Sequence, residues 1–318
     1  MRPEDLELTA TDYRVALAGF LSRPLAIWPA YLQRLLAVGA MPSIQGAAAA
    51  TARGPLKSQG GTAVIPIVGP IDHRNSMFAQ FFGLPTSEGI GSALRSALAD
   101  DAVKSIVFDI DSPGGVVDGI EELAAEIHAA RGQKPMTSVA NSWAASAAYY
   151  VGTQADELVV TPSGEVGSVG VVTFHADWSR YYDALGITPT VLTAGKYKAE
   201  TNPYQPLTTD AAEHIQTELD GYYDMFINAV ARGRGVSASD VRSGFGQGRM
   251  VMAREAVRLG MADRIATLDQ VLGRHGGADN ARRVRGEDGT PPITSLEDPS
   301  SEQKPVSTEA LYALVRTR

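Results

Sequence analysis

The sequence predicts an α/β fold with a largely parallel sheet, and two observations lead to it. Between residues 62 and 273, short apolar runs that are typical of buried strands alternate with segments whose apolar residues have helical spacing. This alternation is typical of parallel strands joined by crossover helices. The chain can also bury a substantial core, because 44% of its 318 residues are hydrophobic.

The predicted strands are short apolar runs such as AVIPIV and SIVFDI. They are expected at residues 63–68, 105–110, 136–140, 157–161, 188–193 and 263–265, with a further β-like segment at 166–174. The predicted helices lie between them, at residues 87–100, 117–131, 144–153, 177–185, 208–232 and 253–259. Ser87 can cap the first of these helices, because its hydroxyl can accept a free N–H of the first turn.

Three further segments flank this region. Apolar residues recur at helical spacing from residue 11 to residue 40, so residues 1–45 are expected to form a helical arm, which Pro24 and Pro29 break into pieces. The Gly- and Ala-rich segment 46–61 is typical of a linker. Residues 274–318 are polar, rich in Gly and Pro and mixed in charge, which predicts a mostly disordered tail.

The composition excludes several classes of function. A net charge of −8 argues against nucleic-acid binding, which needs a clustered basic surface. The absence of cysteine excludes disulfides, Cys-ligated zinc, iron–sulfur clusters and thiol catalysis. No two of the five histidines have metal-ligand spacing, so no metal site is expected. No segment reads as a membrane span or a signal peptide, and the expected compartment is the cytoplasm.

The first motif that could carry chemistry is DSPGG at residues 111–115, between a predicted strand and a predicted helix. Ligands of open α/β sheets bind at the carboxyl ends of strands. A pair of glycines there lets backbone N–H groups approach a ligand, and such groups can bind a developing oxyanion. The alternative is a plain Pro-Gly turn that joins the strand to the helix.

The second motif is AASAA at residues 144–148, in which small residues surround Ser146. Nucleophile elbows use Gly-x-Ser-x-Gly, because a sharp strand-to-helix turn tolerates only small neighbours. The alternative is a helix start that packs closely on the sheet. A third motif, the glycine-rich segment 164–170, lacks both the Lys-Ser/Thr of a phosphate loop and the strand-to-helix setting of a dinucleotide site.

Candidate bases for a serine nucleophile are two lysines and one histidine. Lys196 and Lys198 follow a predicted strand, and burial can lower the pKa of a lysine towards neutrality. In an extended segment both lysines point to the same side, so periodicity does not choose between them. The alternative is that both are solvated loop lysines. His175, which also follows a predicted strand, is the histidine candidate.

Taken together and in this order, these segments resemble peptidase family S49, the signal peptide peptidase A group, and its phage prohead-protease branch. The resemblance spans residues 62–272. Five segments carry it: TAVIPIVGPI, SIVFDIDSPGG, SWAASAAYYVGTQADELVVTPSGEVGSVGV, TAGKYKAETNPYQPLT and GRMVMAREAVRLGMAD. The family usually has Ala-Ser-Gly-Gly-Tyr around its serine, and this chain has ASAAY, which keeps the neighbours small.

The resemblance implies a fold like that of the Clp protease and the crotonases, and a Ser–Lys dyad. Ser146 matches the nucleophile. The family's lysine sits three residues after a glycine that follows a small residue, which selects Lys198 over Lys196. The oxyanion hole would use the N–H groups of Gly114 and Ala147, and Ser168 matches a serine that orients the lysine.

The resemblance also implies a biological role and an oligomeric state. The segment with Asn-Pro-Tyr favours the capsid-maturation branch, hence processing of capsid or scaffold proteins in a phage prohead. The family commonly assembles rings whose active sites are lined by neighbouring subunits, so a homo-oligomer is expected. Three alternatives stay open: a cytoplasmic peptidase of signal peptides or other oligopeptides, a crotonase-like acyl-CoA enzyme, and an inactive capsid scaffold.

Overall fold

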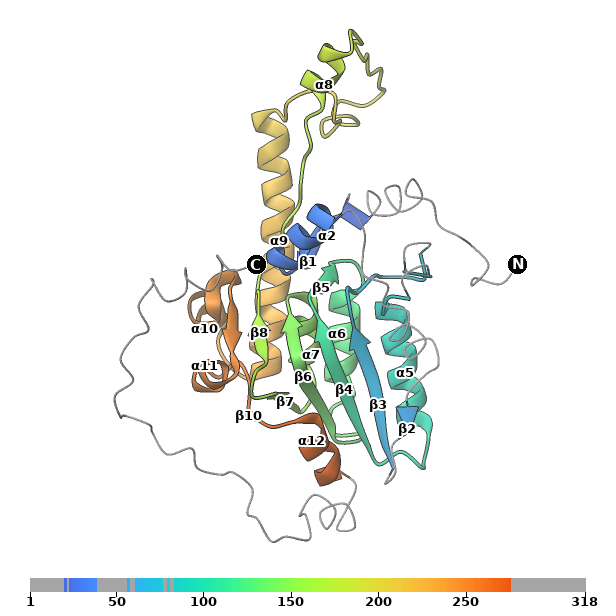
Figure 1. Cartoon of the computed structure of the whole chain (residues 1–318), viewed down its shortest axis with the longest axis vertical. Coiled ribbons are helices and arrows are strands. Elements are labelled where there is room, and N and C mark those ends of the chain that lie inside the picture. The colour runs from blue at the N-terminus through green and yellow to red at the C-terminus, as the bar shows by residue number, and fades with distance from the viewer. Residues whose placement is uncertain are drawn as a thin grey trace, which may run out of the picture. The chain divides into compact units, whose positions relative to one another are not determined.

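The computed structural model describes residues 20–21, 23–38, 56–57, 61–76, 79–80 and 83–275 (Figure 1). Most of the predicted arm and linker, and nearly all of the predicted tail, lie outside these residues. The described part confirms the α/β fold with a mostly parallel central sheet, as expected of a Clp protease-like fold. The division of the chain into arm, linker, peptidase domain and tail stays a prediction.

The sheet follows the order β10-β7-β6-β4-β3-β2. In addition, β8 pairs with the C-terminal end of β6, and β9 pairs with β8. Only β2 and β9 run antiparallel to their neighbours. A separate antiparallel pair joins β1 to β5. The strands are β1 (Leu25–Ile27), β2 (Leu56–Lys57), β3 (Thr62–Val68), β4 (Ser105–Ser112), β5 (Gly114–Val116), β6 (Met136–Ala145), β7 (Glu157–Val160), β8 (Glu165–Gly167), β9 (Met250–Met252) and β10 (Arg264–Ile265).

Helices cover both faces of this sheet. The group α5, α6 and α7 lies on one face, and α12 packs against β4 and β6 on the other (Figure 1). The helices are α2 (Pro29–Val38), α5 (Ser87–Ala99), α6 (Ile120–Ala129), α7 (Ala147–Gly152), α8 (Ser179–Ala184), α9 (Thr209–Arg234), α10 (Ala238–Gly244), α11 (Ala253–Arg258) and α12 (Leu268–His275), with a 3₁₀ turn at Gly246–Gly248. The cap of α5 is Thr86 rather than Ser87, because the Thr86 side chain accepts the N–H of Gly89.

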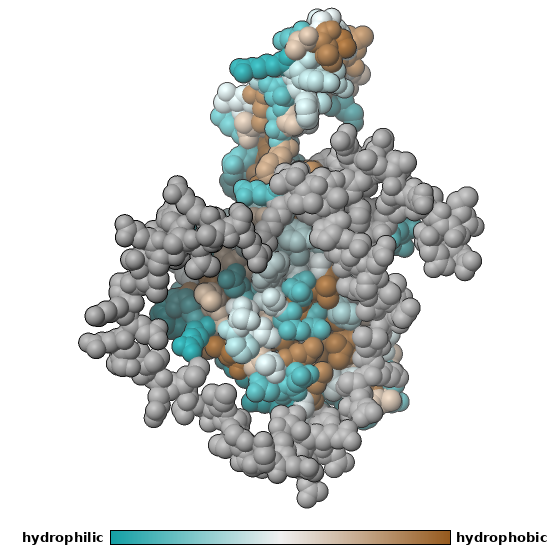
Figure 2. Space-filling view, viewed as in Figure 1, coloured by the Kyte–Doolittle hydropathy of each residue, from teal (hydrophilic) through white to brown (hydrophobic). Residues whose placement is uncertain are grey.

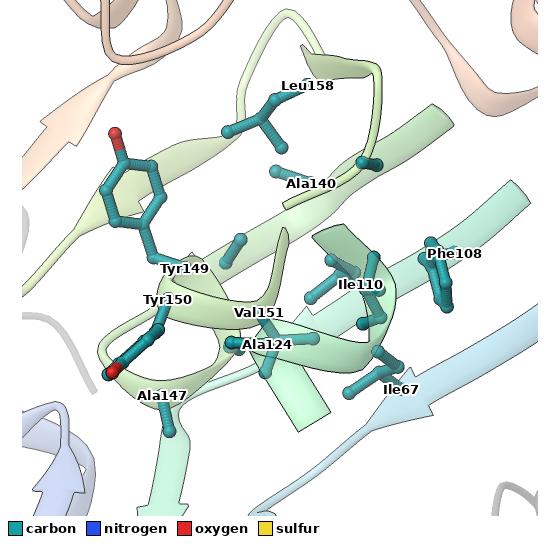
Figure 3. Close-up of a cluster of buried hydrophobic side chains, with 14 of the residues drawn as sticks. Ile67, Phe108, Ile110, Ala124, Ala140, Ala147, Tyr149, Tyr150, Val151 and Leu158 are labelled. Atoms are coloured by element: carbon teal, nitrogen blue, oxygen red, sulfur yellow. The ribbon is translucent and has the colours of Figure 1, made fainter. Parts of the chain in front are cut away.

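The alternation of side chains along β4 shows how the core forms. Phe108 and Ile110 point to the main core under α5, α6 and α7, whereas Val107 joins a smaller cluster with Val271 of α12. In the main core, strand residues such as Ile67 lie with residues of α6 and α7 (Figure 3). This packing fixes the carboxyl ends of β4 and β6, where the candidate motifs lie.

Two strand predictions were wrong. Residues 188–193 form no strand, since they are exposed and no described strand lies beside them to complete a hydrogen-bonded ladder. In the predicted β-like segment 166–174, only the first residues belong to β8, and Val172 makes an isolated bridge to Leu25. The helix predicted at 144–153 begins at Ala147, because the preceding alanines complete β6.

The predicted helical arm was also partly wrong. Its described residues contain the helix α2, but Leu25–Ile27 form the strand β1 instead of helix. Pro24 and Pro29 flank this apolar segment. Proline interrupts a helix because it lacks the N–H that would bond to the preceding turn. It also holds the residue before it in an extended conformation.

Residues 173–207, here called the extension, connect the sheet to α9. They include α8, which lies beyond the N-terminal end of α9 in Figure 1. Between Ala211 and Phe226 no residue of α9 is buried. Large hydrophobic side chains of the extension are exposed: Phe174, Trp178, Tyr181, Leu185, Ile187, Val191, Leu192, Tyr197 and Tyr204. Figure 2 shows hydrophobic residues at the top of the molecule, where α8 lies in Figure 1.

Candidate active site

Ser146 occupies a sharp turn between β6 and α7. Its backbone angles, φ 52° and ψ −119°, lie in a region that residues other than glycine rarely adopt. Alanines on both sides leave room for the turn, and Ser146 itself is fully buried. A strained serine at a strand-to-helix turn is the geometry of a nucleophile elbow. The interpretation of AASAA as a plain helix start therefore accounts less well for this turn.

Backbone hydrogen bonds hold this turn in place. The N–H of Ser146 donates to the carbonyl of Gly167 at 2.7 Å, and the N–H of Tyr150 donates to the carbonyl of Ser146 at 2.9 Å. Ser168 follows directly and also has a positive φ, of 53°. Because β6 and β8 are paired with Ala145 opposite Gly167, the two serines lie next to one another at the ends of neighbouring strands.

Gly114 lies against the same turn. A Cβ atom on Gly114 would be 2.9 Å from the Cβ of Ser146 and 3.0 Å from the carbonyl oxygen of Ala145. Its φ of +94° also favours glycine. The N–H of Gly114 donates to the Ser112 hydroxyl at 3.2 Å. The N–H of Ala147, as the first in α7, has no acceptor within its helix.

The neighbouring Gly115 is required for a different reason. A Cβ atom there would lie 1.9 Å from the carbonyl oxygen of Ile71, so the residue is needed for the close approach of two backbones. The DSPGG segment is accordingly not only a turn, because its glycines begin the strand β5.

The candidate bases do not contact Ser146 within the described chain. The Ser146 hydroxyl donates to the carbonyl of Gly170 at 3.4 Å, a long hydrogen bond, and none joins it to His175. Lys198 is exposed on the extension, and its ammonium has no hydrogen bond or ion pair with any described residue. The other lysine, Lys196, donates to the Tyr197 hydroxyl at 2.6 Å. The structure thus brings Ser146, Ala147, Ser168 and Gly114 together, but not Lys198.

A cavity of about 350 Å³ lies among β1, the start of α6, α7 and α9. It is lined by Ala26, Tyr150, Val171 and Phe226, and by carboxylates that include Glu121. The hydroxyl of Tyr150 donates to Glu121 in a short hydrogen bond. Burial raises the pKa of Tyr150, and the bond to Glu121 raises it further. Tyr150 therefore stays a neutral phenol, which holds one wall of the cavity in place.

One element beside Ser146 was missed by sequence reasoning. The strand β1 pairs with β5, so that Ile27 lies opposite Gly114. The signal that could have revealed it is the apolar triplet LAI between two prolines, which excludes a helix. Its pairing partner could not be predicted, because the two segments are far apart in the sequence.

The described residues contain no group of three or more histidine, aspartate and glutamate side chains arranged to hold a metal ion. None of their helices is both long enough and apolar enough to cross a bilayer.

The chain is similar in sequence to known peptidases and phage proteins. Residues 128–280 match the family model of peptidase family S49, a range that includes Ser146, Ser168 and Lys198. The head-tail preconnector protein GP5 of Enterobacteria phage P21 is 29% identical over 77% of this chain and 48% of its own length. The capsid assembly protease C of Escherichia phage lambda is 29% identical over 71% of this chain and 51% of its own length.

A cellular relative shows similar identity over a shorter range. The putative signal peptide peptidase SppA of Enterococcus faecium is 29% identical over 56% of this chain and 52% of its own length. The chain spans about half the length of these relatives. The similarity to signal peptide peptidases and to phage proteins confirms the resemblance that the sequence motifs indicate.

Proposed function

We propose that the chain is a member of peptidase family S49, whose family model matches residues 128–280, and that it is a serine endopeptidase with Ser146 as nucleophile and Lys198 as general base. One observation supports this proposal above the others. Ser146 stands in the strained turn of a nucleophile elbow, with the backbone of Gly114 packed against it. Such strain is expected where a hydroxyl must be held in one orientation for attack on a substrate carbonyl.

The proposed reaction follows from these positions. Neutral Lys198 accepts the proton of the Ser146 hydroxyl while the oxygen attacks the peptide carbonyl. The N–H groups of Gly114 and Ala147 stabilise the oxyanion, and for this Gly114 exchanges its hydrogen bond to Ser112 for one to the substrate. Protonated Lys198 then donates to the leaving amine, and water releases the acyl-enzyme in the same way. Ser168 orients the lysine ammonium. No cofactor takes part.

The dyad is proposed to form between two copies of the chain. Lys198 lies on the extension, which carries exposed hydrophobic side chains and packs little against its own sheet. In a homo-oligomer, the extension of one copy can bury these side chains and bring Lys198 to Ser146 of a neighbour. Burial in that interface would also remove water from the Lys198 side chain, the kind of environment in which a lysine can act as a general base.

Relatives suggest the substrates. One relative is named as a capsid assembly protease and another as a head-tail preconnector protein. We therefore propose that the chain cleaves capsid or scaffold proteins during assembly of a phage head, in the host cytoplasm. Association of the protein with proheads, when it is produced together with neighbouring head proteins, would support this role. Its absence from them would favour a peptidase of signal peptides or other oligopeptides.

The test of the activity is a comparison of single variants. The purified chain is incubated with a peptide mixture, and new termini are mapped by mass spectrometry. Ser146→Ala and Lys198→Ala should abolish cleavage, whereas the matched variants His175→Ala and Lys196→Ala should retain it. Circular dichroism checks that each variant is folded. Loss with His175→Ala and retention with Lys198→Ala would identify a Ser–His enzyme instead.

Absence of cleavage by the unmodified chain would contradict the peptidase proposal for the isolated protein. Calorimetry with an acyl-CoA then tests a crotonase-like enzyme. Repeating the cleavage assay with assembled proheads distinguishes an inactive scaffold from a protease that works only inside a particle.

A further inference from the structure

We propose that the chain's own segment 23–27 occupies the groove in which the substrate backbone binds, and that a substrate must displace it before Ser146 can act. This inference rests on the proposed peptidase function. It assigns to the N-terminal segment an autoinhibitory role, carried out by β1 and by the arginine that precedes it.

The first argument is the backbone pairing of β1. On one side it runs antiparallel to β5, with Leu25 opposite Val116 and Ala26 opposite Gly115. On the other side, Leu25 and Val172 exchange two hydrogen bonds, each of 2.9 Å. An extended segment held between two backbone edges is the way in which proteins bind peptides by strand addition. These bonds involve only backbone atoms, so any extended peptide could make them.

The second argument is the distance from the nucleophile. A Cβ atom on Gly114 would be 2.2 Å from the carbonyl oxygen of Ala26 and 2.9 Å from the Cβ of Ser146. The backbone of β1 therefore passes over the glycine that lies against Ser146. A substrate carbonyl needs this same space to reach both the Ser146 hydroxyl and the N–H of Gly114, so β1 and substrate exclude one another.

The third argument is that a specific ion pair holds the segment. Arg23 bonds to Asp72 at 2.8 Å and lies 3.6 Å from Asp118. The Asp72 side chain is 1% exposed and also accepts from the Ser76 hydroxyl and the N–H of His73. Without Arg23 this buried carboxylate would lose its cationic partner. The ion pair thus fixes the segment just before it enters the groove.

The fourth argument is that the segment fills its site incompletely. Ala26 contributes only a methyl group to the wall of the cavity of about 350 Å³ that continues beneath it. Leu25 and Ile27 pack with Phe20 and Val116 in a small cluster separate from the main core. A substrate with a larger side chain at the position of Ala26 could fill space that the segment leaves empty. A suitable substrate can therefore compete with the segment for this site.

Linkage to the chain makes the segment an effective competitor. A covalently attached peptide acts at a local concentration of about the millimolar range, far above that of most free substrates. If only a small fraction of molecules has an open groove, the apparent affinity for substrate is the intrinsic affinity multiplied by that fraction. Loosening the segment should therefore lower KM with little change in kcat.

The experiment locks the segment in place with a disulfide. The chain has no cysteine, so Leu25→Cys together with Val172→Cys introduces a single pair of thiols at directly opposed positions. Cleavage of fluorescein-labelled casein is measured with the oxidised and the reduced full chain. We expect a loss of about tenfold or more on oxidation, fully reversed by reductant. The unmodified chain with and without reductant is the control. Equal rates in the two states would overturn the proposal.

A binding assay separates this inference from the peptidase function. The same cysteine pair is placed in Ser146→Ala together with Arg23→Ala, which holds the segment less firmly, and binding of the fluorescent peptide FLSRPLAIWPA, which has the sequence of residues 20–30, is followed by anisotropy. The reduced protein should bind this peptide and the oxidised protein should not. Equal binding in both states, or binding in neither, would overturn the proposal. Gated binding without casein cleavage by the unmodified chain would instead refute only the peptidase function.

A second variant tests the ion pair without any disulfide. Arg23→Ala should lower KM for casein several-fold, because the segment is held less firmly. The matched variant Arg95→Ala removes another arginine–carboxylate pair, with Glu126 on α6, and should leave KM unchanged. If the segment were only a structural strand, Arg23→Ala would reduce activity or leave it unaltered, and either result counts against autoinhibition.

Discussion

Gly114 and Ser146 are packed so closely that a Cβ atom on Gly114 would lie 2.9 Å from the Cβ of Ser146. Gly114→Ala should therefore displace the serine turn or β5, and we expect peptidase activity to fall by about 10²-fold, as is typical of a misplacement of about 1 Å. The measurement is kcat/KM with labelled casein.

Gly132→Ala is the matched control for that variant. Gly132 also has a positive φ, of +80°, but open space surrounds the position of its missing side chain. Its substitution should cost only backbone strain, about 1–2 kcal/mol, and leave activity unchanged. Equal activity of the two variants would show that the contact between Gly114 and Ser146 has no catalytic importance.

The strained backbone of Ser146 predicts an unusual order of stability. At φ 52° and ψ −119° a glycine is less strained than any residue with a Cβ atom. Ser146→Gly should therefore be more stable than Ser146→Ala by about 1 kcal/mol, although both are inactive. Urea denaturation of the two variants measures the difference. A more stable alanine variant would mean that the turn relaxes in solution.

A dyad shared between copies predicts recovery of activity on mixing. Ser146→Ala and Lys198→Ala are each expected to be inactive, but a mixed oligomer contains interfaces where an intact serine faces an intact lysine. Random assembly of equal amounts should restore roughly a quarter of the wild-type rate, because each site combines residues of two subunits. The mixture is assayed after dissociation and reassociation. No recovery in verified mixed oligomers would argue that both residues act within one copy.

Two half-buried carboxylates on β4 predict how stability changes with pH. Burial raises the pKa of Asp109 despite its hydrogen bond from Asn141, and burial also raises the pKa of Asp111. The folded chain therefore binds more protons than the unfolded chain between the ordinary carboxylate pKa, about 4, and the raised values. In that window the free energy of unfolding should increase as the pH falls.

Asp109→Asn should weaken this pH dependence and stabilise the chain at neutral pH, since the amide oxygen can still accept from Asn141. Urea denaturation at pH 5 and pH 8 measures both effects. Asp101→Asn, at an exposed position, is the control and should change neither. An unchanged pH dependence in Asp109→Asn would contradict a raised pKa for this group.

Much of the site was predictable because its parts are local. Periodicity located β3, β4 and β6, and the small residues around Ser146 indicated a tight turn. The two glycines after β4 indicated that another backbone approaches closely there. In the structure, both Gly114 and Gly115 lie too close to a neighbouring backbone to carry a Cβ atom. By contrast, residues 188–193 have the apolar character of a strand but lie on the extension with no strand beside them.

The sequence by itself determined the α/β class, the order of most strands and helices, and the candidate nucleophile, because each depends on neighbours within a few residues. Only the tertiary structure decided that Ser146 is strained and packed against Gly114, that Lys198 is exposed on the extension, and that Leu25–Ile27 pair with β5. These features depend on pairing between segments far apart in the chain. Such pairing is set by the packing of the whole core and has no local pattern that reveals it.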